Sequence, residues 1–313
     1  MSIATADPAG VPVDPTPLDL TPLDAAILHA VAFADVFDHA PTPDEIHRHL
    51  TIAAPVTAVE RRLGKSAALA ERLGRPDGFV VAVGREALVE RRVRRTRVSA
   101  ALWPHARLLG RLIGLLPYVR MVAVTGSLAV DAAGGDADVD LFVIVADGRL
   151  WLARALVVAV VRLAAPAGIR LCPNYLLAEG AIELDEAERT YGTAREIAQM
   201  VPLAGFSTYR RFLARNDWYV AFQPNHLPAG TRRADGGRGL LRRTVERIGR
   251  ASPLDRLERW EMRRKVRRLR AATRSPEARY DARRCKGHVE GHAGRTAATV
   301  EARFRELLGD PRR

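Results

Sequence analysis

Residues 118–144, YVRMVAVTGSLAVDAAGGDADVDLFVI, limit the possible fold more than any other part of the chain. Residues 121–124 form a short apolar run that ends at a Gly-Ser turn signal, which is typical of a buried strand. Asp138-Val139-Asp140 then opens a second apolar run, LFVIV. Because side chains alternate along a strand, Asp138 and Asp140 are expected on one face, about 7 Å apart. The segment predicts two strands, with a pair of carboxylates where the second begins.

These two carboxylates predict a cation site, because like charges this close repel unless a positive charge lies between them. Mg²⁺ (or Mn²⁺) bound by one or two carboxylates plus substrate phosphates meets that need. Gly126 allows backbone N–H groups to approach phosphate oxygens closely, and Ser127 adds a hydroxyl. We therefore predict that Asp138 and Asp140 bind the metal, and that Gly126 and Ser127 bind the phosphates of a substrate.

The same residues resemble the signature of the DNA polymerase β-like nucleotidyltransferase superfamily. In that signature an apolar residue precedes Gly and then Gly or Ser, and Asp-apolar-Asp/Glu-apolar follows after roughly ten residues. Here ten residues separate Gly126-Ser127 from Asp138-Val139-Asp140. The resemblance implies a small mixed-sheet core and a Mg²⁺-dependent enzyme that moves a nucleoside monophosphate from an NTP to an acceptor, releasing pyrophosphate. It makes Asp138 and Asp140 the catalytic carboxylates.

The resemblance also implies a third carboxylate on a neighbouring strand, which helps bind a second metal and activates the acceptor. The matching strand is expected at 170–177, RLCPNYLL, where the candidate position holds Asn174. An amide can ligate a metal but is not a base at neutral pH. Glu179, Glu183 or Asp136 could substitute, so the second metal and the base of the reaction stay open.

Two arginines are candidates for nucleotide phosphates, because a guanidinium can bind a phosphate bidentately. Arg149 follows an Asp-Gly turn after the second strand, and Arg195 lies on a helix expected at 191–200. For each of them a local ion pair is the competing interpretation.

Five segments make up the predicted multi-domain α+β protein: a disordered tail (1–20), a winged-helix-like module (21–84), a connecting helix (85–117), the nucleotidyltransferase core with a helical extension (118–228) and a basic helical C-terminal segment (229–313). Thr-Pro pairs at 21–22 and 42–43 are start signals for helices. A third helix and a strand at 78–83 complete the winged-helix order. Blocks such as FADVFDHAPTPDEI and YGTAREIAQMVPL also resemble a bacterial group of nucleotidyltransferase-domain proteins with this arrangement.

The net charge of +13 is confined to the C-terminal segment. Residues 1–228 hold 24 Lys and Arg against 25 Asp and Glu, whereas residues 229–313 hold 25 against 11. Only three of the 49 basic residues are lysines, which indicates a GC-rich genome and weakens arginine abundance as a sign of phosphate binding. A helix at 254–270 combines an apolar stripe with eight basic residues, and it either packs on the body or binds a polyanion such as RNA or DNA.

A second function therefore competes with the enzyme: a catalytically degenerate protein that binds nucleic acid, or regulates, through the winged helix and the basic segment. Another basic cluster at 91–97 is interpreted as a solvated face rather than a phosphate contact. Two cysteines and an N-terminus without a signal-peptide pattern predict a soluble, cytoplasmic protein. Arg154 and Arg162 interrupt the most apolar segment, so no transmembrane helix is expected. The acceptor, the NTP and the oligomeric state stay open.

Overall fold

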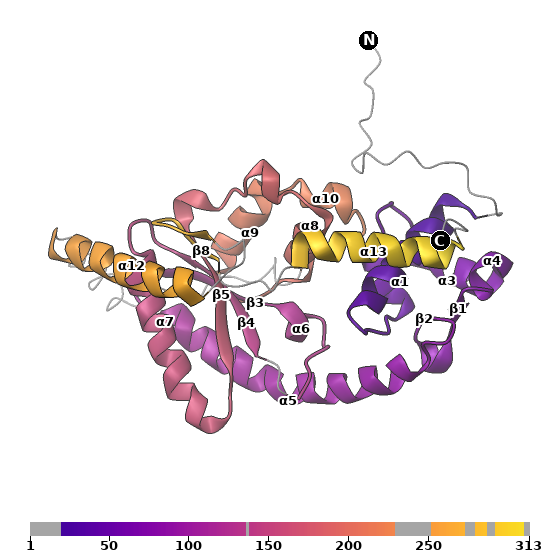
Figure 1. The fold of residues 1–313 in the computed structure, drawn as a ribbon, viewed down its shortest axis with the longest axis horizontal. Coiled ribbons are helices and arrows are strands. Elements are labelled where there is room, and N and C mark those ends of the chain that lie inside the picture. Colours follow the sequence, from indigo (N-terminus) through magenta and orange to yellow (C-terminus); the bar gives the residue numbers. More distant parts are fainter. Residues whose placement is uncertain (1–19, 136–137, 229–251, 273–278, 287–291, 310–313) are drawn as a thin grey trace, which may run out of the picture.

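One long helix, α5 (Ala87–Leu115), joins a six-stranded sheet to a helical N-terminal module (Figure 1). The arrangement comes from a computed structural model, which describes residues 20–135, 138–228, 252–272, 279–286 and 292–309. The single helix predicted for 85–116 is confirmed. Because α5 reaches from the module to the sheet, it contacts both parts of the molecule.

The sheet has the strand order β6-β3-β4-β5-β8-β7. Strands β3 and β4 pair antiparallel, whereas β4 and β5 pair parallel and are connected by helix α7 (Leu150–Ala164). The predicted mixed sheet and α+β class are therefore confirmed. The strands are β3 (Val119–Thr125), β4 (Val139–Val145), β5 (Leu171–Ala178), β6 (Val201–Ala204), β7 (Arg279–Tyr280) and β8 (Arg284–Lys286).

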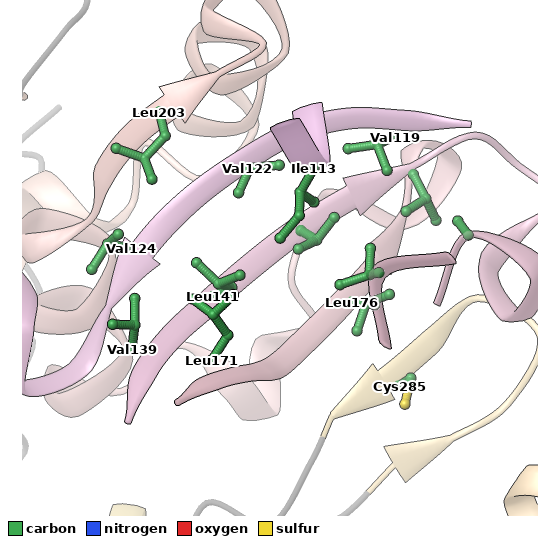
Figure 2. Close-up of a cluster of buried hydrophobic side chains, with 14 of the residues drawn as sticks. Ile113, Val119, Val122, Val124, Val139, Leu141, Leu171, Leu176, Leu203 and Cys285 are labelled. Atoms are coloured by element: carbon green, nitrogen blue, oxygen red, sulfur yellow. The ribbon is translucent and has the colours of Figure 1, made fainter. Parts of the chain in front are cut away.

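Helices cover both faces of the sheet, because alternate side chains of the central strands belong to two different apolar clusters. Val139 and Leu141 of β4 pack with α5, α7 and α12 (Ser252–Ala272), and Figure 2 shows this cluster. Phe142 and Ile144 of the same strand pack on the other face. That face is covered by α8 (Tyr191–Gln199), α9 (Phe206–Arg215) and α10 (Tyr219–Phe222).

The N-terminal module has four helices and a β hairpin, one helix more than expected, because a break at Ser66 separates α3 from α4. Thr21 and Thr42 each form a capping box, which fixes where the first two helices begin. The predicted strand at 78–83 is shorter than expected, because residues 76–78 form a 3-10 turn and only two residues of each strand pair. The elements are α1 (Pro22–Val36), α2 (Pro43–Arg48), α3 (Val56–Lys65), α4 (Ala67–Ala70), β1 (Leu73–Gly74) and β2 (Val81–Ala82).

The C-terminal segment is not wholly helical, which corrects the sequence-based prediction. It supplies β7 and β8, and β8 pairs with β5, with Cys285 opposite Leu176. Without β8 the parallel strand β5 would be an exposed sheet edge, so the segment completes the core sheet. Its last helix, α13 (His292–Leu308), packs on α1 in the N-terminal module (Figure 1).

Three further 3-10 turns and one short helix complete the description, and none of them adds a layer to the fold. Among the described residues, no helix combines the length and the apolar character needed to cross a membrane. The remaining elements are α6 (Gly126–Ala129) and the turns Ala165–Ala167, Glu179–Ala181 and Glu186–Glu188.

Candidate functional site

The two halves of the sequence motif meet where β3 ends and β4 begins. Thr125, the last residue of β3, is the register partner of Asp140. Gly126 follows with a φ of +65°, and a Cβ atom on it would lie 2.4 Å from Asp140 Oδ2. A side chain at this position is excluded by both the backbone conformation and the carboxylate. Glycine therefore allows the turn to lie against Asp140.

Neither Asp138 nor Asp140 forms an ion pair with another of the residues that the structure describes. Asp138 is exposed and directly precedes β4, while Asp140 is half-buried on the same strand face as Phe142. Burial and then the charge of Asp138 raise the pKa of Asp140, a hydrogen bond with Cys172 lowers it, and the net value is about 6. A cation beside the two carboxylates would relieve this repulsion.

Cys172, rather than Asn174, is the β5 residue opposite Asp140. The register then shifts, because β5 places Pro173 and Asn174 where β4 has the single residue Leu141. Sequence reasoning missed Cys172, although a proline inside a strand is a signal for such a bulge. Burial and the charges of the two aspartates raise the pKa of the Cys172 thiol to about 11, so it stays protonated at neutral pH.

The proposed substitutes for a third carboxylate lie away from the aspartate pair. Glu179 follows the far end of β5, where it forms ion pairs with Arg120 and Arg211. Glu183 lies further along and pairs with arginines of its own. Asp136 lies outside the described residues.

The ligands present fit a cation that is only partly coordinated by protein. In the described part of the chain, no three His, Cys, Asp or Glu side chains form a group that could hold a metal ion. The two neighbouring carboxylates suit Mg²⁺, which often binds one or two carboxylates and completes its octahedron with water and substrate phosphates. A closed, protein-only metal cage does not fit these residues.

Arg149 is not brought to the aspartate pair. It follows the opposite end of β4, and the seven residues of that strand span about 20 Å. Its guanidinium forms an ion pair with Asp255 of α12 at 2.7 Å and lies near the Tyr118 ring. Arg149 therefore forms a local ion pair, which was the competing interpretation of this residue.

Arg195 lies on α8 and is buried against the N-terminal module. The guanidinium carbon lies 4.0 Å from the centre of the Phe33 ring, and Nη1 donates to the Tyr191 hydroxyl at 3.3 Å. Burial, and then the charge of Arg195, lower the pKa of His29 and His49. Its helix contacts α6, which carries Ser127, but the contacts of the guanidinium are with the module.

The loop that links the two halves of the motif is held by α5. Arg92 is 6% exposed and donates to the backbone oxygen of Val130 at 2.9 Å and to Glu45 at 2.8 Å. The Trp103 indole N–H donates to Asp131 Oδ1 at 2.8 Å. The prediction that the 91–97 cluster is a solvated face is therefore wrong for Arg92, because this arginine is buried and its hydrogen bonds connect the module with the core.

The structure thus brings together Gly126, Ser127, Asp138 and Asp140, and it places Arg149 and Arg195 in other surroundings. Asn174 lies in the β5 bulge that follows Cys172, not opposite Asp140. The assembled site has two carboxylates, a tight glycine turn and a protonated thiol. Comparison with known proteins gives no match: no family model fits the chain, and no curated protein or solved structure is significantly similar to it.

Proposed function

We propose that the protein is a Mg²⁺-dependent nucleotidyltransferase of the DNA polymerase β-like superfamily, which transfers a nucleoside monophosphate from an NTP to an acceptor hydroxyl. One observation carries the proposal: the Gly126 turn lies so close to Asp140 that a Cβ would be 2.4 Å from its carboxylate. The phosphate-binding turn and the metal-binding strand required by this chemistry therefore share one location.

In this mechanism Asp138 and Asp140 hold the cation and orient it toward the phosphates. A bound Mg²⁺ supplies positive charge that stabilises the charge developing on the transferred phosphoryl group. The backbone N–H groups of the Gly126 turn and the hydroxyl of Ser127 bind phosphate oxygens in this proposal. Positioning and charge stabilisation supply most of the rate enhancement in such transfers.

The reaction forms a bond between the acceptor oxygen and the α-phosphorus and breaks the bond from that phosphorus to pyrophosphate. The acceptor proton leaves to water, because the Cys172 thiol, with a pKa of about 11, is not a base at neutral pH. Cys172 instead holds the Asp140 carboxylate through their hydrogen bond. Its role in the proposal is to position Asp140.

The test is transfer of label from α-³²P NTPs in the presence of Mg²⁺, with each of the four NTPs assayed separately. Asp138→Asn and Asp140→Asn should each reduce labelling by at least about 100-fold, since each removes a charged ligand. Asp217→Asn is the matched control, because Asp217 is an exposed aspartate on the same domain. Labelling that survives both site substitutions, or that is equal without divalent cation, would contradict the proposal.

A further inference from the structure

Helix α12 separates its charged residues by face. All three of its acidic residues lie toward the body of the protein: Glu258 is buried and accepts hydrogen bonds at 2.8 and 2.9 Å from two backbone N–H groups in the first turn of α7. Glu261 is also buried, and Asp255 pairs with Arg149 at 2.7 Å. These acids attach α12 to the core and leave no acid for its outer face.

Six arginines of α12 are exposed, and Arg268 lies apart from the other five. These five we call the arginine face: Arg256, Arg259, Arg263, Arg267 and Arg270. They follow one another at intervals of three or four residues, so at 3.6 residues per turn they form one stripe about 21 Å long. Within the described part of the chain, no carboxylate forms an ion pair with any of the five. The stripe is therefore an uncompensated row of positive charge.

An arginine-rich genome does not explain this arrangement, because composition changes the number of arginines but does not sort them by face. Three apolar side chains of α12, Met262, Val266 and Leu269, are partly buried and pack on the core. Leu257, which the sequence placed in the same apolar stripe, is instead 44% exposed. The acidic and these apolar residues of α12 thus contact the body of the protein, whereas the five arginines of the stripe are exposed.

A single aromatic side chain interrupts the arginine face. Trp260 is 58% exposed, and the guanidinium carbon of Arg264 lies 5.2 Å from its ring centre. Proteins that bind single strands combine a positive groove or stripe for the backbone with aromatic side chains on which unpaired bases stack. Trp260 among these arginines has that combination.

We propose that the arginine face and Trp260 bind single-stranded nucleic acid, with phosphates on the arginines and one base stacked on the indole. A stacked strand carries one phosphate per about 3.4 Å, so the stripe faces about six nucleotides. RNA and DNA share this chemistry. The proposal does not rest on nucleotidyl transfer, and it holds whether the bound strand is an acceptor or a separate ligand.

The first test is fluorescence anisotropy of the full-length protein with four probes: a 20-nucleotide oligo(U), a 20-nucleotide oligo(dT), a 20-base-pair DNA duplex and phosphatidylserine-containing vesicles. Oligo(U) or oligo(dT) should bind at least about tenfold more tightly than the duplex, and comparison of the two identifies RNA or DNA as the ligand. Tighter binding to the duplex, or binding only to the vesicles, would overturn the proposal.

The second test is the salt dependence of the arginine variants. With five contacts on a single strand, log K should fall with log salt at a slope of about −3.5, or about 100-fold between 50 and 200 mM. Arg263→Gln/Arg267→Gln should make the slope shallower by about 1.4. Arg97→Gln/Arg111→Gln removes the same charge from exposed positions of α5 and should leave the slope unchanged. Equal effects of the two double variants would refute a specific arginine face.

The third test separates base stacking from charge alone. Trp260→Ala should weaken oligonucleotide binding by at least about fivefold, whereas Trp260→Phe should restore most of it. Neither change should alter binding of heparin, a polyanion without bases. Loss of heparin binding in parallel with the oligonucleotide, or no effect of Trp260→Ala on either, would overturn the stacking role.

Discussion

Charged residues in the N-terminal module and on α12 are used in opposite ways. In the module, Asp24 is fully buried and is held by the guanidinium of Arg62, and Arg92 is buried against Glu45. On the outer face of α12 the arginines are exposed, and no carboxylate of the described residues pairs with them. The aspartate pair at the start of β4 is likewise uncompensated, but with the opposite sign.

This difference shows that the net charge is a poor guide to function until the ion-pair partner of each charged residue is known. Arg62 and Arg92 have carboxylate partners, so their contribution is structural, and a ligand would have to displace those partners. The arginine face, Asp138 and Asp140 have no ion-pair partner among the described residues. The following changes would break or sharpen this distinction.

The largest effect on stability is expected where a buried carboxylate loses the arginine with which it pairs. Arg62→Met leaves the Asp24 carboxylate buried without its guanidinium, which should lower the free energy of unfolding by about 3 kcal/mol. Arg61→Met, at the neighbouring exposed position, should change it by less than about 0.5 kcal/mol. Urea denaturation measures both, and similar losses would show that the module does not depend on paired charge.

Acid should weaken the module through Glu45. Burial alone would raise its pKa, but the hydrogen bond with His39, the charge of Arg92 and the Thr42 N–H outweigh burial and lower it to about 2. Stability from a depressed pKa is present above about pH 4.5 and is lost as the pH falls toward about 2. Glu45→Gln should therefore cost about 2 kcal/mol at pH 6 and almost nothing at pH 2.

Glu60→Gln is the control for the pH experiment, because Glu60 is exposed on α3. Unfolding free energies from urea titrations between pH 6 and pH 2 give the comparison. A cost of Glu45→Gln that does not change with pH would mean that packing, and not charge, explains its effect.

Removing a charge at the candidate site should stabilise the fold. The raised pKa of Asp140 means that its contribution to stability is complete below about pH 3.8 and is lost as the pH rises through about 6. Asp140→Asn should therefore increase the free energy of unfolding by about 1.5 kcal/mol at pH 8 and by nothing at pH 4. A destabilised variant at pH 8, measured without divalent cation, would argue against uncompensated charge at this position.

The smallest effect on stability is expected on the arginine face. Arg263→Gln/Arg267→Gln removes two exposed charges without unpairing any described carboxylate, so the free energy of unfolding should change by less than about 0.5 kcal/mol. Thermal unfolding followed by circular dichroism measures this. A large loss would place these arginines with the paired charges of the module, against the distinction drawn above.

Sequence patterns predicted what depends on short-range chemistry. Thr21 and Thr42 begin helices because their hydroxyls cap the first turn, and that signal is local. The meeting of Gly126 with Asp140 was also predictable, because one short spacer joins two adjacent antiparallel strands. Both features require only residues that are close in the sequence.

Contacts between residues that are far apart in the sequence could not be predicted from sequence patterns. The pairing of β8 with β5 joins residues more than one hundred positions apart, and a three-residue strand carries too little alternation to be recognised. For the third carboxylate the sequence pointed to Asn174, whereas the register places Cys172 opposite Asp140 and Asn174 in the bulge that follows. Arg92 is likewise buried only because the N-terminal module packs on α5 in the folded protein.

The contact of α13 with α1 has a consequence for the order in which the molecule assembles during synthesis. Phe304, Leu307 and Leu308 complete the apolar cluster that Ile27 and Leu28 begin. At about 5–20 residues per second, the ribosome needs some tens of seconds between making these two parts. The first module to emerge therefore waits with an incomplete core until the last helix arrives, and only the finished chain can close it.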